Sequence, residues 1–265
     1  MLKDNVRFSN FNYLNKVRET IFDPLGRDIL NETQWVQLNH KWGNAKFPVV
    51  ISGTGDPIIL LHGFDSSLLE FRRIFPSLKK NFQIIIPDLL GFGFSPRIFN
   101  NQYNPENIIL NLKDLIKELN ISKKLKIVGA SMGGSAALLL SKQISKDIDK
   151  TLLLSPAGLF ENAKSIPRPF NQLGAAFLGL PLVRKNLCRQ AFAYPNKSVG
   201  IEEEQIASIH IGCDGWRNSL ASFARSGGFG GSYEYLQNIP IKTVCGLNDR
   251  ILGENEINKL KETKE

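Results

Sequence analysis

Several features that mark other protein classes are missing from this sequence. No apolar run approaches the roughly 18 residues that a membrane-spanning helix needs. The start, MLKDNVRFSN, has no apolar signal segment, so we expect a cytoplasmic protein, with peripheral membrane association left open. The three cysteines, Cys188, Cys213 and Cys245, form no CxxC pair and no metal-ligand cluster. Free thiols in a reducing compartment are therefore expected, and no metal or other cofactor.

Nucleic-acid motifs and internal repeats are also missing. The net charge is +8, but the basic residues are scattered in short clusters such as Lys123-Lys124, without a stripe interleaved with aromatics. A solvated surface is the expectation, with attraction to an anionic membrane surface as the alternative. The longest apolar patch, Leu173 to Val183, is too short to span a membrane but could touch a lipid surface or an oily substrate. The oligomeric state stays unknown.

Strand and helix patterns alternate through most of the chain, which predicts a mostly parallel sheet with helices on both faces. Continuous apolar runs such as Gln83 to Pro87 are typical of buried parallel strands. Helices are expected over Asn107 to Leu119, preceded by an Asn-Pro start signal, and over Ser135 to Ile144. The expected organisation is a helical leader at 1–33, a first core part at 34–157, a cap at 158–238, and a second core part at 239–265.

The strongest local motif is Gly129-Ala130-Ser131-Met132-Gly133, a G-x-S-x-G sequence between an apolar strand and a helix. In that context a sharp strand-to-helix turn exposes the central serine oxygen. The next N–H, that of Met132, and the start of the helix then face a developing oxyanion. The motif predicts a nucleophilic serine at Ser131.

A second oxyanion donor is expected in the loop after the strand Ile58 to Leu61, where the sequence reads His62-Gly63-Phe64-Asp65. The N–H of Phe64 is the candidate. His62 and Gly63 are expected to shape the loop, although His62 could also be considered as a base. Residues 88–95 contain glycines but lack the third glycine of a dinucleotide fingerprint, so a structural turn is expected there.

The acid that orients a catalytic histidine should follow a later strand, and Asp249, after Ile241 to Gly246, fits that place. The usual order is serine, acid, histidine. The three histidines are His40, His62 and His210, and none follows Asp249. One further strand and helix of such a fold are also expected and missing. The chain could be shortened with little activity, or His210 could act as the base, or the protein could bind without catalysis. Otherwise His210 and Trp216 are candidates to line a pocket.

Three segments resemble the α/β-hydrolase family, and within it chlorophyll dephytylase and its cyanobacterial-type relatives. They are HGFDSSLLEFRRIFPSL from His62, IHIGCDGWRNSLASFARSGGF from Ile209 and IKTVCGLNDRIL from Ile241. The resemblance implies the α/β-hydrolase fold with a cap insertion, and hydrolysis of a hydrophobic carboxylic ester, such as a long-chain or phytyl ester. It implies Ser131 as nucleophile, Asp249 as acid, and Phe64 and Met132 as oxyanion donors. The family's histidine has no counterpart here. Arg72 and Arg73 belong to the shared motif, and an ion pair with Glu70 is expected for them.

A serine ester hydrolase is thus the first hypothesis. A non-catalytic small-molecule-binding relative, and an acyltransferase or perhydrolase using the same serine, are the alternatives.

Overall fold

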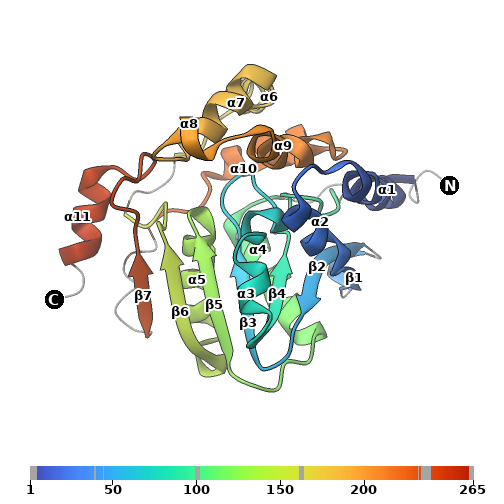
Figure 1. Ribbon diagram of the computed structural model, residues 1–265, viewed down its shortest axis with the longest axis vertical. Coiled ribbons are helices and arrows are strands. Elements are labelled where there is room, and N and C mark those ends of the chain that lie inside the picture. The colour runs from blue at the N-terminus through green and yellow to red at the C-terminus, as the bar shows by residue number, and fades with distance from the viewer. Residues whose placement is uncertain are drawn as a thin grey trace.

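Figure 1 shows the computed structural model, in which one sheet carries helices on both sides. The structure describes residues 5–38, 40–43, 45–98, 102–160, 164–231, 233 and 240–262. The sheet has seven strands in the order β1-β2-β4-β3-β5-β6-β7. The first two pairings are antiparallel and the other four are parallel, which confirms the expected mostly parallel sheet. The strands are β1 Thr33–Gln37, β2 Lys46–Ser52, β3 Asp56–Leu61, β4 Phe82–Pro87, β5 Leu125–Ala130, β6 Ile148–Leu154 and β7 Ile241–Val244.

The helices fall into three groups along the chain. An N-terminal pair precedes the sheet, three lie among the sheet strands, and the rest follow β6, with one of them after β7. Their bounds are α1 Asn5–Thr20, α2 Pro24–Asn31, α3 Phe75–Leu78, α4 Pro105–Glu118, α5 Met132–Gln143, α6 Phe170–Leu178, α7 Pro181–Gln190, α8 Pro195–Ser198, α9 Ile201–Ser208, α10 Trp216–Ser226 and α11 Glu254–Glu262. Short 3-10 helices are η1 His40–Trp42, η2 Leu68–Phe71, η3 Ser145–Asp147 and η4 Ile209–Gly212.

Successive side chains of the central strands point to opposite faces of the sheet, and each face carries a hydrophobic core. In β3, Ile59 and Leu61 pack into the core that also contains buried residues of α4 and α5. Ile58 and Leu60 point the other way, into the core that α1 and α2 cover. Successive strand residues face opposite sides, so an all-apolar strand needs cover on both. Helices α1 and α2, which lie in the region expected as a helical leader at 1–33, therefore complete the second core.

Helix α4 begins where the sequence signals indicate. The side chain of Asn104 accepts a hydrogen bond of 2.9 Å from the N–H of Asn107, and Pro105 is the first helical residue. An N-cap side chain satisfies a donor that the helix cannot pair itself. The apolar positions Ile108, Leu112 and Leu115 are buried against the sheet, as their spacing predicts.

Between β6 and β7 the chain leaves the sheet and forms helices α6 to α10 and η4. In Figure 1 helices α6 to α9 cross the top of the view, above one end of the strands. This segment lies within the region expected as a cap, of which residues 161–163, 232 and 234–239 lie outside the described residues. Its contacts with the loop after β3 set the surroundings of the candidate site.

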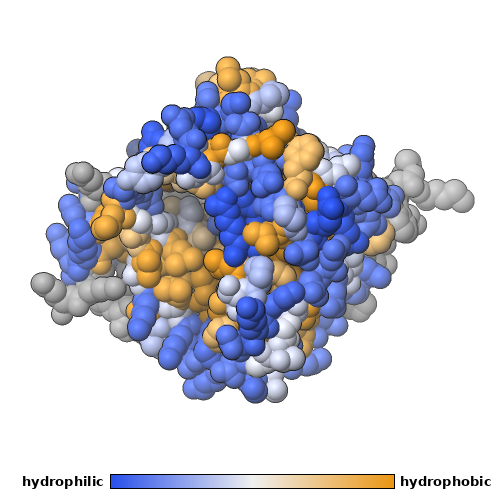
Figure 2. All heavy atoms as spheres, in the orientation of Figure 1, coloured by the Kyte–Doolittle hydropathy of each residue, from blue (hydrophilic) through white to orange (hydrophobic). Residues whose placement is uncertain are grey.

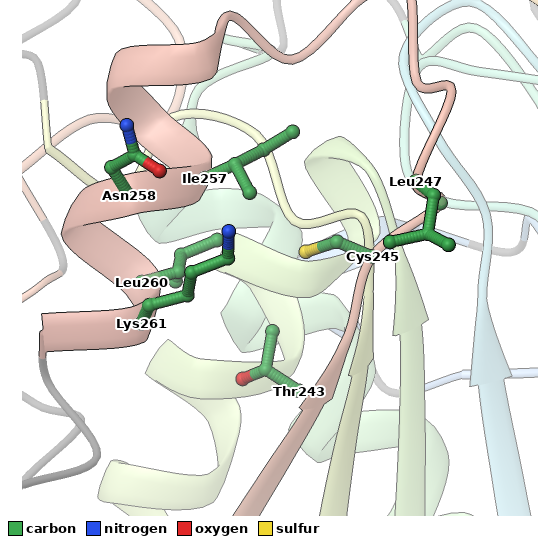
Figure 3. A pocket seen from close by; sticks show the side chains of 8 residues that line it. Thr243, Cys245, Leu247, Ile257, Asn258, Leu260 and Lys261 are labelled. Carbon is green, nitrogen blue, oxygen red and sulfur yellow. The ribbon is translucent and has the colours of Figure 1, made fainter.

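Strand β7 is the last strand of the sheet and pairs with β6. Helix α11, which the sequence patterns did not indicate, follows it and packs Leu260 against Leu138 and Leu159. Figure 3 shows a hollow between β7 and α11, lined by apolar side chains with Thr243, Asn258 and Lys261. Among the described residues, no helix has both the length and the apolar character that crossing a membrane requires.

Candidate functional site

Ser131 occupies the turn between β5 and α5, with φ 50° and ψ −121°. Such a positive φ is uncommon outside glycine and marks local strain. The glycines on either side are sterically required. A methyl group at Gly133 would lie far inside van der Waals contact of the carbonyl oxygen of Leu61, and one at Gly129 would meet the carbonyl of Gly133. The turn therefore holds a half-buried serine at the end of the sheet.

The loop after β3 lies directly against this serine. A methyl group at Gly63 would be 3.3 Å from Ser131 Cβ. The N–H of Gly63 already donates to Glu70 Oε2 at 2.9 Å. The N–H of Met132 lies in the first turn of α5, where helix N–H groups have no intrahelical acceptor. Phe64 follows Gly63 in this loop and Met132 follows Ser131, so each expected oxyanion donor is one residue from the contact between Gly63 and Ser131.

His62 is a buried, neutral ring that braces this loop. Its Nδ1 donates to the carbonyl of Gly63 at 2.8 Å, and its Nε2 accepts the N–H of Leu89 at 3.0 Å. Burial lowers the pKa of His62 to about 4. Because both ring nitrogens are engaged by backbone groups, this arrangement supports the loop-shaping role expected from the sequence.

Glu70 is a site residue that the sequence reasoning did not select. Its carboxyl group faces Gly63, the glycine that packs against Ser131: a methyl group at Gly63 would lie 3.5 Å from Glu70 Oε2 and 3.3 Å from Ser131 Cβ. Burial raises the pKa of Glu70, against the opposing effect of hydrogen bonds from the N–H of Gly63 and the side chain of Ser66. The only signal in the sequence was an acidic residue within the apolar run LLEF of the shared motif.

The expected ion pair between Glu70 and the arginines is wrong. Arg72 is buried and binds Asp23, which caps α2, and Glu203 of α9 at 3.3 Å. Arg73 also binds Glu203. Neither arginine reaches Glu70 within ion-pair distance in the described part of the chain. Their nearness to Glu70 in sequence was misleading, because the turn at η2 points the carboxyl group toward Gly63 and the guanidinium groups toward the leader and α9.

Asp65 is the centre of a buried cluster that joins the loop to the segment expected as a cap. It binds Arg184 of α7, His210 Nε2 at 3.1 Å and Trp216 Nε1 at 2.8 Å. Burial raises the pKa of Asp65, but hydrogen bonds and the charges of His210 and Arg184 outweigh this, and the pKa is lowered overall. Burial lowers the pKa of His210. The structure thus places His210 and Trp216 in this cluster, whose central residue, Asp65, directly follows Phe64 in the chain.

Asp249 lies in the turn after β7 and is held by its own loop. Its Oδ1 accepts the N–H groups of Ile251 at 2.9 Å and Leu252 at 3.0 Å. Burial raises the pKa of Asp249, but these bonds and one from the Ser155 side chain lower it below its usual value.

The end of β6 connects Asp249 to Ser131. Leu154 accepts the N–H of Ser131 at 2.9 Å, and the following residue, Ser155, bonds to Asp249. The two therefore lie at the same edge of the sheet.

Four aromatic rings surround the outer side of the loop. Phe64 is 45% exposed, and its ring lies 6.0 Å from the rings of both Phe92 and Phe223. Phe223 also contacts Phe229, with ring centroids 6.0 Å apart. The loop that packs against Ser131 is therefore apolar on this side.

Comparison with known proteins agrees with this architecture. Residues 56–181 match the family model described as alpha/beta hydrolase fold. A 2-hydroxy-6-oxo-6-(2'-aminophenyl)hexa-2,4-dienoic acid hydrolase from Metapseudomonas resinovorans is 26% identical, over 84% of this chain and 78% of its own. The alpha/beta hydrolase domain-containing protein VTE7 of Arabidopsis thaliana is 26% identical, over 91% of this chain and 77% of its own. The solved structure of a meta-cleavage product hydrolase (CumD) from Pseudomonas fluorescens IP01 has a TM-score of 0.67 and 22% identity, over 82% of each chain.

Proposed function

We propose that this chain, which has the alpha/beta hydrolase fold, is a serine hydrolase of carboxylic esters. The observation that carries the proposal is the positive-φ serine between β5 and α5, with the loop of Gly63 packed against it. In this proposal Ser131 attacks the ester carbonyl. Asp249, at the same edge of the sheet, serves as the acid.

The oxyanion would be held by two backbone donors. The N–H of Gly63 is taken by Glu70, which leaves Phe64 on the loop and Met132 at the start of α5. Donors aimed at the developing negative charge contribute about 10²–10³ each in rate. The dipole of α5 adds to this, because its positive end lies at Met132. Glu70 and His62 would hold the loop so that Phe64 keeps its place.

The substrate class we favour is a hydrophobic ester, with a long-chain or phytyl ester as the finer proposal. The loop of Gly63 packs against Ser131, and the rings of Phe64, Phe92 and Phe223 that cluster at this loop support an apolar group near the site. The resemblance of the segments from His62, Ile209 and Ile241 to chlorophyll dephytylase supports the finer proposal. Aromatic side chains supply large apolar contact at little cost in conformational entropy.

A second candidate is a protein that binds such molecules without turning them over. A serine hydroxyl is a weak nucleophile until a base takes its proton. Both nitrogens of His62 are engaged by the backbone, and His210 Nε2 is held by Asp65. The contacts of these two histidines favour the binding candidate.

Labelling with a fluorophosphonate probe separates the two. For the hydrolase we expect the 265-residue chain to be labelled, with Ser131→Ala reducing the labelling to background. Ser198→Ala, a change at a serine of α8, should leave it unchanged. Adding imidazole should raise hydrolysis of a p-nitrophenyl ester by the wild type but not by Ser131→Ala. If the chain shows neither labelling nor imidazole rescue but still binds the ester, the hydrolase is rejected and the binding candidate remains.

A further inference from the structure

Helix α6 presents three of its four large apolar side chains to solvent, while the fourth, Leu178, packs against the core. Phe170, Leu173 and Phe177 are 64%, 59% and 58% exposed. Their spacing of three and four residues places them on one face of the helix. The protein-facing side carries Asn171 and Ala175, and Asn171 Nδ2 donates to the carbonyl of Ala221 at 2.9 Å. In an ordinary surface helix the apolar stripe faces the core, so the orientation of α6 is reversed.

The apolar surface continues into the start of α7. Leu180 is 50% exposed and Leu182 is 70% exposed. We call Phe170, Leu173, Phe177, Leu180 and Leu182 the outer apolar face. Figure 2 shows hydrophobic surface at the top of the view, where Figure 1 places α6 and α7. Contiguous exposed apolar patches in soluble proteins mark sites of interaction.

The charged residues of the segment that carries this face have one sign. Residues 164–200 contain six lysines and arginines and no aspartate or glutamate. Arg184 is buried against Asp65. Lys164, Arg168, Lys185 and Lys197 are exposed, and Lys185 also pairs with Glu204 of α9. A surface that combines apolar anchors with basic side chains complements anionic lipid headgroups.

We infer that the outer apolar face binds an anionic bilayer surface, with α6 lying in the interface between headgroups and acyl chains. A second copy of the chain is a poorer occupant. A symmetric contact would bring two basic segments together, and like charges across an interface oppose association. The inference does not depend on Ser131, because binding to lipid is measured without turnover.

The turn after α6 also lies close to the candidate site. A methyl group at Gly179 would lie 3.1 Å from the ring of Trp216, whose Nε1 binds Asp65 in the loop before η2. A bilayer bound at α6 would therefore lie near the Asp65 cluster, because Trp216 contacts both the turn after α6 and Asp65.

Flotation with lipid vesicles tests this inference. The wild type should bind vesicles of equal parts phosphatidylcholine and phosphatidylglycerol, and should release as salt is added. Leu173→Ser/Phe177→Ser should lower the affinity about tenfold or more, because two apolar anchors are lost. Arg168→Gln/Lys185→Gln should lower it several-fold, and only on the anionic vesicles.

The matched control is Val244→Ser/Leu247→Ser, which removes two exposed apolar side chains from the end of β7 and should leave vesicle binding unchanged. A second pair, Phe170→Ser/Leu182→Ser, should repeat the loss, and circular dichroism should show every variant folded. The inference is overturned if the wild type stays off anionic vesicles, or if the control pair loses as much affinity. It is also overturned if the outer face instead forms a dimer that Leu173→Ser/Phe177→Ser dissociates on size exclusion.

Discussion

The two ends of the proposed catalytic machinery are held in very different ways. Around Ser131, several polar side chains hold the loop after β3: Glu70 binds Gly63, His62 binds Gly63 and Leu89, and Asp65 binds three side chains that are 119, 145 and 151 residues away. Around Asp249, the carboxylate is held by N–H groups of its own turn and by Ser155. Leu247, two residues before Asp249, is fully exposed.

This difference shows that Ser131, the proposed nucleophile, is positioned by packing, whereas Asp249, the proposed acid, is positioned by a local turn. Buried polar groups are costly to leave unpaired, so the serine side should be sensitive to single changes. An exposed turn can exchange lost hydrogen bonds for water, so the acid side should be tolerant. Matched substitutions on the two sides can test that contrast.

The largest contrast is expected between Gly133→Ala and Gly246→Ala. The methyl group at 133 meets the backbone of β3, which cannot move without breaking the sheet, so we expect a loss of about 5 kcal/mol or more, or no folded protein. At 246 the nearest atom to the methyl group is the nitrogen of Asp249 at 3.8 Å, and the change should be near neutral. Urea unfolding measures both. Equal losses of stability in the two variants would contradict the proposed difference between the serine side and the acid side.

Removing a buried cation should have the next largest effect. Arg184→Met removes the guanidinium group that binds the buried carboxylate of Asp65, and about 3–5 kcal/mol of stability should be lost. Arg250→Met removes an exposed arginine beside Asp249 whose bond to the carbonyl of Phe192 is 3.4 Å long, and should cost less than about 0.5 kcal/mol. Thermal denaturation of the pair tests this. A mild effect at 184 would mean that His210 and Trp216 suffice to hold Asp65.

The pH dependence of stability should carry the signature of His62. Its folded pKa of about 4 lies below the ordinary 6.5, so between these values the unfolded chain binds a proton that the folded ring excludes. Stability is therefore lost as pH falls through this window, by about 3 kcal/mol in total from this group. His62→Gln, which keeps a donor and an acceptor, should flatten that part of the profile. Parallel urea-unfolding profiles for the two proteins would contradict the assignment.

The smallest contrast is expected between Asp249→Ala and Glu70→Ala. Asp249→Ala removes hydrogen bonds from Ile251 and Leu252 in a half-exposed turn, and the free energy of unfolding should fall by about 1 kcal/mol. Glu70→Ala, which leaves the buried N–H of Gly63 unpaired, should cost about 1–3 kcal/mol and slow fluorophosphonate labelling as well. A larger loss at 249 than at 70 would reverse the comparison.

Local patterns allowed much of this molecule to be predicted. The apolar runs and their punctuation indicated the strands of the sheet, and the G-x-S-x-G sequence indicated the turn at Ser131. These signals are local because they depend on side-chain periodicity and on steric limits between near neighbours. The helix α11 was missed because its short, charged sequence packs only Leu260 into a core. The ion pairing of Arg72 and Arg73 was predicted wrongly for a related reason, since it was inferred from neighbours in sequence.

Ser131 between a strand and a helix, and the alternation that makes a parallel sheet, were determined by the sequence itself. Only the tertiary structure decided that Glu70 holds Gly63, that Asp65 meets Arg184, His210 and Trp216, and that α6 turns its apolar side outward. The partners of Asp65 are 119, 145 and 151 residues away in the chain. No periodicity relates residues so far apart. They meet only when whole helices pack against the end of the sheet. There the carboxylate of Asp65 is buried, and because a buried charge without partners is costly, the fold must supply them.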